Sequence, residues 1–210
     1  GWQFGNRRPL VGSYDVTELF AEALVPLAKD AFLAKSLDLN AAVRSTDYST
    51  SGNVVSWKAG LTYEPITGLR LRANRSRDIR AANLVELYTP GVSIVGAIVD
   101  YGRPGNPSSS VPTTTIGNPE LEPELADTTT IGVVWEPSFT SGLSMSVDYY
   151  DIDLQDAIGS LGGQNIVSGC YGRSPFTAPQ PELCDLISRD PTTNVITNVN
   201  NQTLNLAYIQ

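Results

Sequence analysis

Histidine is absent from this sequence of 210 residues. Its absence removes the imidazole that serves as base in Ser-His-Asp and Cys-His catalysis and as ligand in ordinary zinc sites. Basic residues are also scarce, because 14 lysines and arginines stand against 22 aspartates and glutamates, for a net charge of −8. No basic stretch is long enough to follow a phosphate backbone, so we expect no nucleic-acid partner. An enzymatic interpretation would have to rest on carboxylates.

Long apolar runs are missing as well. No uninterrupted run reaches the roughly 18 residues that a membrane-spanning helix needs, and the longest lies near 93–99. The sequence begins at Gly1 without an initiator methionine and stops at Gln210 inside an alternating run that includes Leu204, Leu206 and Tyr208. A strand that ends with the polypeptide needs a neighbouring strand from elsewhere. We therefore expect this chain to be a piece of a larger protein.

Alternation of apolar and polar residues is the strongest pattern present, and it is clearest between Val54 and Arg80. Two consecutive segments place apolar side chains at odd positions and polar ones at even positions, with Pro65 and Gly68 between them. Successive side chains point to opposite faces of a strand. The pattern predicts an antiparallel hairpin whose apolar face carries Val55, Trp57, Ala59, Leu61, Tyr63, Leu69, Leu71 and Ala73.

Four further segments, 14–25, 36–44, 126–135 and 143–150, alternate with the same period, although Phe20 breaks the rule in the first. With the run at the end of the chain they make about seven strands. The length of each strand is close to the roughly 9 to 11 residues that a tilted strand needs to cross a bilayer. A soluble sandwich shows the same alternation. The pattern alone leaves a transmembrane barrel and a soluble β-domain both open.

The connections between these strands are unequal in length. For strands that run up and down, the short connections 26–35, 65–68 and 136–142 fall at one end. A tight turn at 49–53 and two very long connections, 81–124 and 154–200, fall at the other. Connections above about 12 to 15 residues are usually functional or disordered. Short turns on one rim and long loops on the other are typical of transmembrane barrels.

Register follows from keeping the apolar faces of paired strands together. Tyr63 and Trp135 each lie beside a short turn, so we expect both at one rim, where a membrane barrel carries an aromatic girdle. The predicted cross-strand pairs are Thr62 with Arg72 and Glu64 with Arg70 in the first hairpin, and Trp135 with Leu143, Val133 with Met145 and Ile131 with Val147 in the later one.

Cys170 and Cys184 are the only cysteines, and both lie in the second long connection. A bridge between them would close a loop of about 15 residues and stabilise it by roughly 3 kcal/mol. Such a bridge implies an oxidising compartment. The alternative is a pair of free thiols, which would be open to oxidation in an exposed loop.

The acidic residues Asp148, Asp151, Asp153 and Asp156 suggest a calcium loop or a glycosidase pair at first sight. If the strand continues, however, Asp148 faces away from Asp151 and Asp153, and no glycine occupies the sharp-turn position of an EF-hand loop. We interpret these residues as solvated charges at a strand end. We expect no catalytic residue, no metal site and no cofactor.

Four motifs follow one another along the chain: the strand entry 14–22 running to Pro26 and Leu27, the segment 44–49 with Gly52, the run 69–74 leading to 80–88, and the segment 117–124. Taken together and in this order, they resemble the barrel of TonB-dependent outer-membrane receptors. In that family the segment that begins here at Arg80 usually reads Arg-Ala-Pro, and Ala82 stands where the proline would be. The resemblance covers nearly the whole chain.

This resemblance implies that residues 1–210 are part of an antiparallel up-and-down transmembrane β-barrel in the bacterial outer membrane, with long outer loops. The plug domain that fills such a barrel, and the TonB box through which the inner-membrane protein TonB supplies energy, lie outside these residues. The implied function is energy-coupled uptake of a scarce large ligand, such as a siderophore, cobalamin or a glycan. The implied partners are outer-membrane lipid, the plug, TonB and that ligand.

Candidate ligand-binding residues lie in the two long connections. Arg80, Glu86 and Tyr88 open the first, where they would line the ligand vestibule or pin the loop to the barrel rim. The connections are rich in Gly, Pro, Ser, Thr and Asn and carry Tyr101, Tyr171 and Phe176; this composition suits polar ligands and excludes few ligand classes. Two alternative functions stay open, a passive porin-like barrel and a secreted β-rich domain that binds or hydrolyses carbohydrate.

Overall fold

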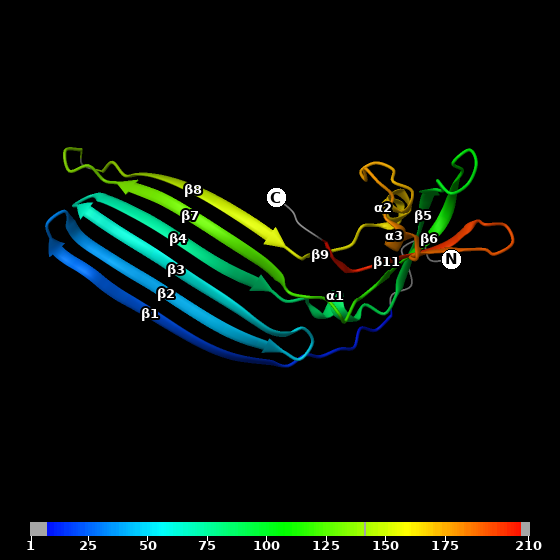
Figure 1. Ribbon diagram of the computed structural model, residues 1–210, viewed down its shortest axis with the longest axis horizontal. Helices are drawn as coiled ribbons and strands as arrows, with labels where there is room; N and C mark the ends of the chain where they lie inside the picture. Colours follow the sequence, from blue (N-terminus) through cyan, green and yellow to red (C-terminus); the bar gives the residue numbers. More distant parts are fainter. Residues whose placement is uncertain (1–7, 141, 207–210) are drawn as a thin grey trace. The chain divides into compact units, whose positions relative to one another are not determined.

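The computed structural model describes residues 8–140 and 142–206, and it divides into two compact units (Figure 1). The strand sheet comprises residues 14–81 and 122–157, and the described residue Leu206 is grouped with it. The loop subdomain comprises the described residues 8–13 together with 82–121 and 158–205. Antiparallel strands dominate the structure, which confirms the all-β prediction.

The strand sheet has six strands, and their order in the sheet follows their order in the chain. Among the described residues, β1 and β8 each have a strand neighbour on one side only, so the sheet is not closed, as expected for part of a barrel. The strands are β1 (Val16–Ala31), β2 (Ala34–Tyr48), β3 (Gly52–Ile66), β4 (Leu69–Arg80), β7 (Glu124–Trp135) and β8 (Met145–Gln155).

The two faces of the strand sheet differ as predicted. Odd-numbered residues pair with odd-numbered neighbours across the sheet, as Leu61 does with Leu39 and Ala73, so apolar side chains gather on one face. On that face the residues Leu19, Ile131 and Val147 are 78%, 57% and 70% exposed. A soluble sandwich would bury such side chains against a second sheet. Their exposure supports a face built to contact lipid.

Cross-strand register is confirmed for one of the two predicted pairs in the first hairpin and is wrong by two residues in the second. Thr62 lies opposite Arg72 as predicted, but an irregularity after Tyr63 leaves Glu64 without a paired position on β4. In the later hairpin Trp135 lies opposite Met145, Val133 opposite Val147 and Ile131 opposite Tyr149. The shift preserves parity, because the connection 136–144 is two residues longer than predicted and β8 starts at Met145.

Strand β1 is longer than the alternating run predicted. Pro26 was expected to end it, but the strand continues to Ala31 with an irregularity between Pro26 and Ala28. Proline lacks a backbone donor, and an edge strand tolerates it at a bulge without breaking the ladder. The turn to β2 is therefore only Phe32 and Leu33. The predicted tight turn before Gly52 is confirmed, since β2 ends at Tyr48 and β3 begins at Gly52.

Tyr63 and Trp135 lie at the rim with the short turns, as predicted. The Tyr63 hydroxyl donates a hydrogen bond to the carbonyl of Leu33 in the β1–β2 turn. The Trp135 ring contacts Phe139 in the β7–β8 connection edge-on, with 6.0 Å between ring centroids. Phe32 and Phe139 are 93% and 78% exposed, which extends the aromatic character of this rim.

The last predicted strand is present only in part. Its described portion is β12 (Leu204–Leu206), which pairs with the short strand β9 (Ala157–Gly159). The predicted continuation through Tyr208 lies outside the described residues.

The loop subdomain contains the two long connections, and these are folded together rather than disordered. Its four-stranded sheet has the order β10-β11-β6-β5. The first connection supplies α1 (Leu84–Tyr88), β5 (Val92–Val99) and β6 (Ser108–Ile116); the second supplies α2 (Gly163–Cys170), α3 (Pro181–Cys184), β10 (Ile187–Arg189) and β11 (Ile196–Gln202).

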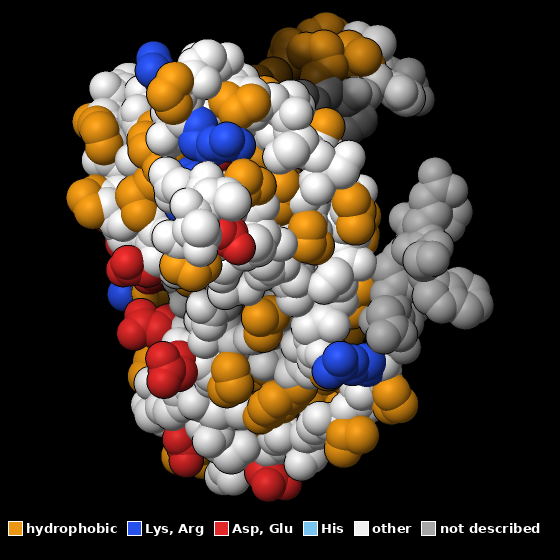
Figure 2. Space-filling model, turned by 90° about the vertical axis from the view of Figure 1, so that its right-hand side faces the viewer, with side chains coloured by type: hydrophobic (Ala, Val, Ile, Leu, Met, Phe, Trp, Pro, Cys, Tyr) orange, Lys and Arg blue, Asp and Glu red, His pale blue; other side chains and the backbone are white. Residues whose placement is uncertain are grey.

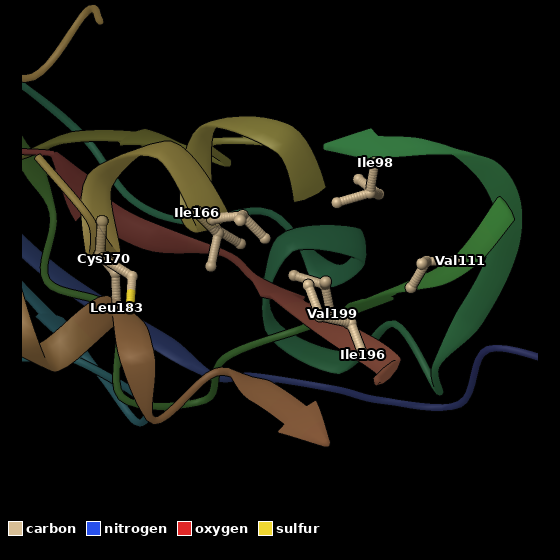
Figure 3. Close-up of a cluster of buried hydrophobic side chains, with 8 residues drawn as sticks. Ile98, Val111, Ile166, Cys170, Leu183, Ile196 and Val199 are labelled. Atoms are coloured by element: carbon tan, nitrogen blue, oxygen red, sulfur yellow. The ribbon is translucent and has the colours of Figure 1, made fainter. Parts of the chain in front are cut away.

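A small hydrophobic core holds the loop subdomain together (Figure 3). Ile98 and Val111 come from the first connection and pack with Ile166, Val167 and Val199 from the second. Val167 and Val199 have no exposed surface, so both connections exclude water from one shared interior. A second cluster contains Ala82, Leu87 and Leu121. In the described part of the chain, no helix has the length and apolar character needed to cross a membrane.

Candidate functional site

The two long connections join through a parallel pair of strands. Strand β11 runs beside β6 from the pair Val199–Thr113 to the pair Gln202–Ile116. A side-chain bond supports the join, since the Thr114 hydroxyl donates to Asn198 Oδ1 at 2.7 Å. Parallel strands cannot form from a local hairpin and require a long connection between them. The two connections therefore form one four-stranded sheet.

A nearly buried ion pair between Asp100 and Arg189 also joins the first long connection to the second. The Arg189 guanidinium donates to both carboxylate oxygens of Asp100, at 2.7 and 2.8 Å. The Asp100 carboxylate also accepts from the Gly102 backbone N–H at 3.0 Å, and Arg189 contacts the Tyr171 hydroxyl at 3.2 Å. The hydrogen bonds from Arg189 hold the pKa of Asp100 below its ordinary value, against the opposing effect of burial.

Cys170 and Cys184 form a disulfide, which confirms the predicted bridge over the alternative of free thiols. It joins the last residue of α2 to the last residue of α3. Cys170 is 6% exposed and lies in the loop core beside Leu183. The bridge therefore fixes the second connection where it packs against the first.

The aromatic candidates of the loops lie around this core. Tyr101, Tyr171 and Phe176 are partly buried and pack against it. The Arg173 guanidinium lies 5.6 Å from the centroid of the Tyr101 ring, which is a cation–π contact. Tyr101 follows Asp100 directly in the chain, and the Tyr171 hydroxyl accepts a hydrogen bond from Arg189 of the ion pair.

The three candidates that open the first connection have clear structural partners. Arg80 forms a bidentate pair with Glu124, its opposite residue on β7, with both distances 2.6 Å. Glu86 accepts from the Asn83 backbone N–H in a capping box that starts α1. Tyr88 packs against Gly12, where a side chain would collide with its ring. Arg80 thus pairs within the strand sheet, whereas Glu86 and Tyr88 make their contacts within the loop subdomain; the choice between ligand binding and loop anchoring stays a prediction.

The segment 117–121 returns the first connection close to α1. The Gly117 N–H donates to the Thr89 carbonyl at 3.0 Å, and the Asn118 N–H donates to the Glu86 carbonyl at 2.8 Å. A Cβ at Gly117 would meet the backbone of Leu87 and Thr89, so this approach requires glycine. Leu121 is 1% exposed and completes the small cluster with Leu87. The motif is therefore a packed joint rather than a solvated one.

The even-numbered face of the strand sheet carries paired charges. Arg72 makes a bidentate pair with Asp148 across Gly132, at 2.6 and 2.9 Å, and a side chain at Gly132 would collide with this pair. A hollow of about 480 Å³ is lined largely by residues of this face, among them Glu18, Phe20, Arg44, Lys58 and Asp78. Phe20, the exception to the alternation, lies under the Arg44 guanidinium at 5.7 Å.

The acidic stretch on β8 is divided between faces, as predicted for a continuing strand. Asp148 lies opposite Gly132 on the even face, whereas Asp151 and Asp153 lie opposite Thr129 and Asp127 on the odd face. Asp127 is itself paired with Arg77 at 2.6 Å. Of these carboxylates only Asp151 fits the predicted solvated charge: Asp148 is paired with Arg72, and Asp153 is half-buried, with one carboxylate oxygen that has no hydrogen-bond partner among the described residues.

Sequence reasoning missed the charged residues of the loop subdomain. Asp100 and Arg189 were not candidates, because no local motif connects residues so far apart in the chain. One signal was available: the connections contain only three basic residues, Arg103, Arg173 and Arg189. When two long loops contain so few basic residues, it is reasonable to ask whether these residues pair with acidic residues of the other loop.

A family model for the β-barrel of TonB-dependent receptor-like proteins matches residues 3–207. The chain belongs to the TonB-dependent receptor β-barrel family. The match spans both the strand sheet and the loop subdomain, so the folded loops belong to this barrel family too. A comparison with curated proteins finds no match.

Solved TonB-dependent receptors share the fold. The siderophore receptor PirA from Acinetobacter baumannii matches with a TM-score of 0.58 at 16% identity, over 93% of this chain and 24% of that one. A mutant ferric enterobactin receptor, PfeA, from Pseudomonas aeruginosa in complex with enterobactin matches with a TM-score of 0.62 at 19% identity, over 93% and 23%. The chain spans about a quarter of the length of these receptors.

Proposed function

We propose that this chain supplies part of the barrel wall and two outer loops of a bacterial outer-membrane receptor that takes up a large, scarce ligand by energy-coupled transport. Its partners in this proposal are outer-membrane lipid, a plug domain, the energy-transducing protein TonB and the ligand. The observation that carries the proposal is the family match over nearly the whole chain, together with the matching fold.

The strand sheet supports a position in a membrane. Its odd-numbered face is apolar and exposed, and a shallow groove of about 450 Å³ on that face is lined by residues that include Leu61, Leu71, Ile131 and Val147. Its even-numbered face carries the ion pairs and the polar hollow. Apolar outside and polar inside is the arrangement of a transmembrane barrel wall.

The loop subdomain supports a receptor rather than a passive pore. A shared core, a disulfide and a nearly buried ion pair hold the two connections in a defined structure. Binding sites gain affinity when their loops are ordered before the ligand arrives. In Figure 2 uncharged polar side chains and backbone atoms, drawn in white, make up much of the visible surface, and apolar side chains are scattered among them.

Among the ligand classes implied by the family, we favour the siderophore class. Solved receptors with the same fold include proteins named as siderophore receptors, one of them in complex with enterobactin. Cobalamin and glycans are the other classes to be tested. A secreted carbohydrate-binding or hydrolytic domain is not favoured, because the exposed apolar face has no second layer from its own sheet.

Uptake in living cells tests the proposal. The gene that encodes this chain would be expressed in a bacterium lacking its own siderophore receptors, in strains with and without TonB, and accumulation of iron-loaded siderophores would be measured. We expect accumulation that depends on both the gene and TonB, with the protein in the outer-membrane fraction. Accumulation that is independent of TonB would favour a passive barrel. Recovery of the protein from the culture medium, soluble without detergent, would contradict the proposal.

A further inference from the structure

The apolar stretch of the odd-numbered face ends in one register row on three neighbouring strands. On β4, β7 and β8 the first polar odd-numbered positions toward the long connections are Arg75, Thr129 and Asp151, which lie opposite one another across the sheet. On the adjacent strand β3 the odd-numbered positions at and beyond this row are still apolar, including Trp57 and Val55. The apolar surface is therefore shorter on β4, β7 and β8 than on β3.

Arg75 is exposed at this boundary and has no counter-charge of its own. In the described part of the chain, its guanidinium forms no ion pair and no side-chain hydrogen bond. Asp127 lies one row farther out on β7, but both of its carboxylate oxygens accept from Arg77, at 2.6 and 2.8 Å. Asp151 lies one strand beyond Thr129. An arginine beside hydrocarbon is costly unless an anion accompanies it, so Arg75 needs an anion from outside the strand sheet.

An apolar groove lies next to this row, on the side of the short turns. Its volume is about 450 Å³, and Leu61, Ala73, Ile131 and Val147 are among its lining residues. Ala73 lies between Leu61 and Ile131 in one register row, so a small side chain separates two large ones. Arg75 follows Ala73 by two positions on the same face, about 7 Å along the strand. An apolar groove beside a free positive charge matches an acyl chain that carries an anionic headgroup.

The position of β4 in the sheet limits what can reach Arg75. β4 already has β3 and β7 as its neighbours, so no further strand can pair with it, and a partner must approach the face. In the proposed barrel this face contacts lipid, where phosphate is the anion attached to acyl chains. A short apolar stretch draws the bilayer surface toward it by local thinning. The planar fork of arginine binds phosphate oxygens in pairs.

We propose that Arg75 and the groove at Ala73 form a binding site for a phosphorylated lipid, with the phosphate on the Arg75 guanidinium and an acyl chain in the groove. The inference rests on the proposed function, because it needs the odd-numbered face to contact lipid. Thr129 supplies a hydroxyl in the same row as Arg75. Asp151 repels the phosphate and so confines it to the β4 side of Thr129.

Native mass spectrometry of the intact receptor, released from detergent micelles that contain one added lipid, tests this site. The lipids are phosphatidic acid and a diacylglycerol with the same chains but no phosphate. Arg75→Gln removes the charge, and Ala73→Phe fills the groove without changing the charge. Arg70→Gln is the matched control, because it removes an exposed arginine from the even-numbered face of the same strand. We expect wild type to retain more phosphatidic acid than diacylglycerol.

Arg75→Gln should lower the retention of phosphatidic acid about fivefold, which corresponds to the roughly 1 kcal/mol that one basic residue contributes at an anionic lipid surface. Arg75→Lys should keep most of the binding, because it keeps the charge. Ala73→Phe should lower the retention of both lipids. Amide protection in β4 and β7 reports whether each variant is folded.

Equal retention of the two lipids by wild type, equal loss in Arg75→Gln and Arg70→Gln, or full retention in Ala73→Phe would overturn the inference. A mass of two receptor copies that is lost in Arg75→Gln would assign this face to a second copy and would also overturn it. If Arg75→Gln retains lipid like wild type while siderophore accumulation still needs TonB, the inference fails and the receptor function stands. Absence of the wild-type protein from the outer-membrane fraction would instead contradict the receptor function itself.

Discussion

The Arg189 guanidinium donates hydrogen bonds to both carboxylate oxygens of Asp100, a residue 89 positions earlier in the chain. The Asp100 side chain is 4% exposed and the Arg189 side chain is 19% exposed. The pair links the turn after β5 to the end of β10, so it closes the loop subdomain across two segments that have no local contact in sequence. Removing either partner would leave the other charge poorly solvated.

Asp100→Asn should therefore destabilise the loop subdomain by about 3 kcal/mol, because the guanidinium of Arg189 loses its counter-charge in a nearly buried position. Native-state hydrogen exchange of amides in β6 and β11 measures the free energy of opening. Glu182→Gln, which removes an exposed carboxylate from the same subdomain, should change it by less than about 0.5 kcal/mol. Equal effects of the two variants would show that the ion pair does not hold the loops together.

Acid should weaken the same subdomain. The pKa of Asp100 is lowered in the folded state by the hydrogen bonds from Arg189, and the pKa of Asp190 is lowered by hydrogen bonds from Thr193. A carboxyl with a lowered folded pKa stabilises the fold above its unfolded pKa of about 3.9, and that stabilisation is lost as pH falls through the folded pKa. We expect the opening free energy to be level near neutral pH and to fall below about pH 4, with a smaller fall in Asp100→Asn. A rise in stability on acidification would contradict this.

The disulfide should stabilise the second connection mainly by restricting its unfolded state. Cys170 and Cys184 are separated by 14 positions, and closing a loop of this size is worth about 3 kcal/mol. The double variant Cys170→Ser and Cys184→Ser should lower amide protection in α2 and β11 by that amount and leave β3 unchanged. Loss of protection in both β3 and α2 would mean that the loop subdomain and the strand sheet unfold together.

A charge on the odd-numbered face should be costly, whereas the same charge on the adjacent even position should be tolerated. Ile131→Lys should destabilise the barrel by about 2 to 4 kcal/mol if this residue lies near the bilayer midplane. Thr130→Lys is the matched control, because it lies one residue earlier on β7 and faces the opposite way. Urea unfolding of the intact protein in lipid vesicles measures both. Equal destabilisation by the two lysines would remove the distinction between the faces.

Alternation made the strand sheet predictable. Leu61 and Thr62 differ in polarity because they lie on opposite faces of the sheet. The same alternation repeats along the whole strand and can therefore be recognised in the sequence. Register was predictable only in parity: Trp135 pairs with Met145 instead of Leu143, because a shift of two residues keeps every apolar side chain on the same face. The end of β1 was missed because Pro26 is accommodated at a bulge.

The loop subdomain was far less predictable. The pairing of β6 with β11 joins residues such as Thr113 and Val199, and short polar strands give little periodic signal. Among the candidates, Tyr101 contacts Arg173 and Tyr171 contacts Arg189, whereas Glu86 caps α1. The cysteine pair was the exception, since two cysteines in one loop restrict the possibilities to one bridge.

The most direct test of the account is the accessibility of spin labels placed one at a time from Val55 to Tyr63 on β3, in the intact protein in lipid bilayers. Odd positions should collide mainly with oxygen, which concentrates in lipid, and even positions mainly with a water-soluble nickel chelate, so the two signals should alternate with opposite phase. Labels at Trp57, Ala59 and Leu61 that meet neither reagent, or that meet the chelate as readily as their even-numbered neighbours do, would contradict a lipid-facing sheet.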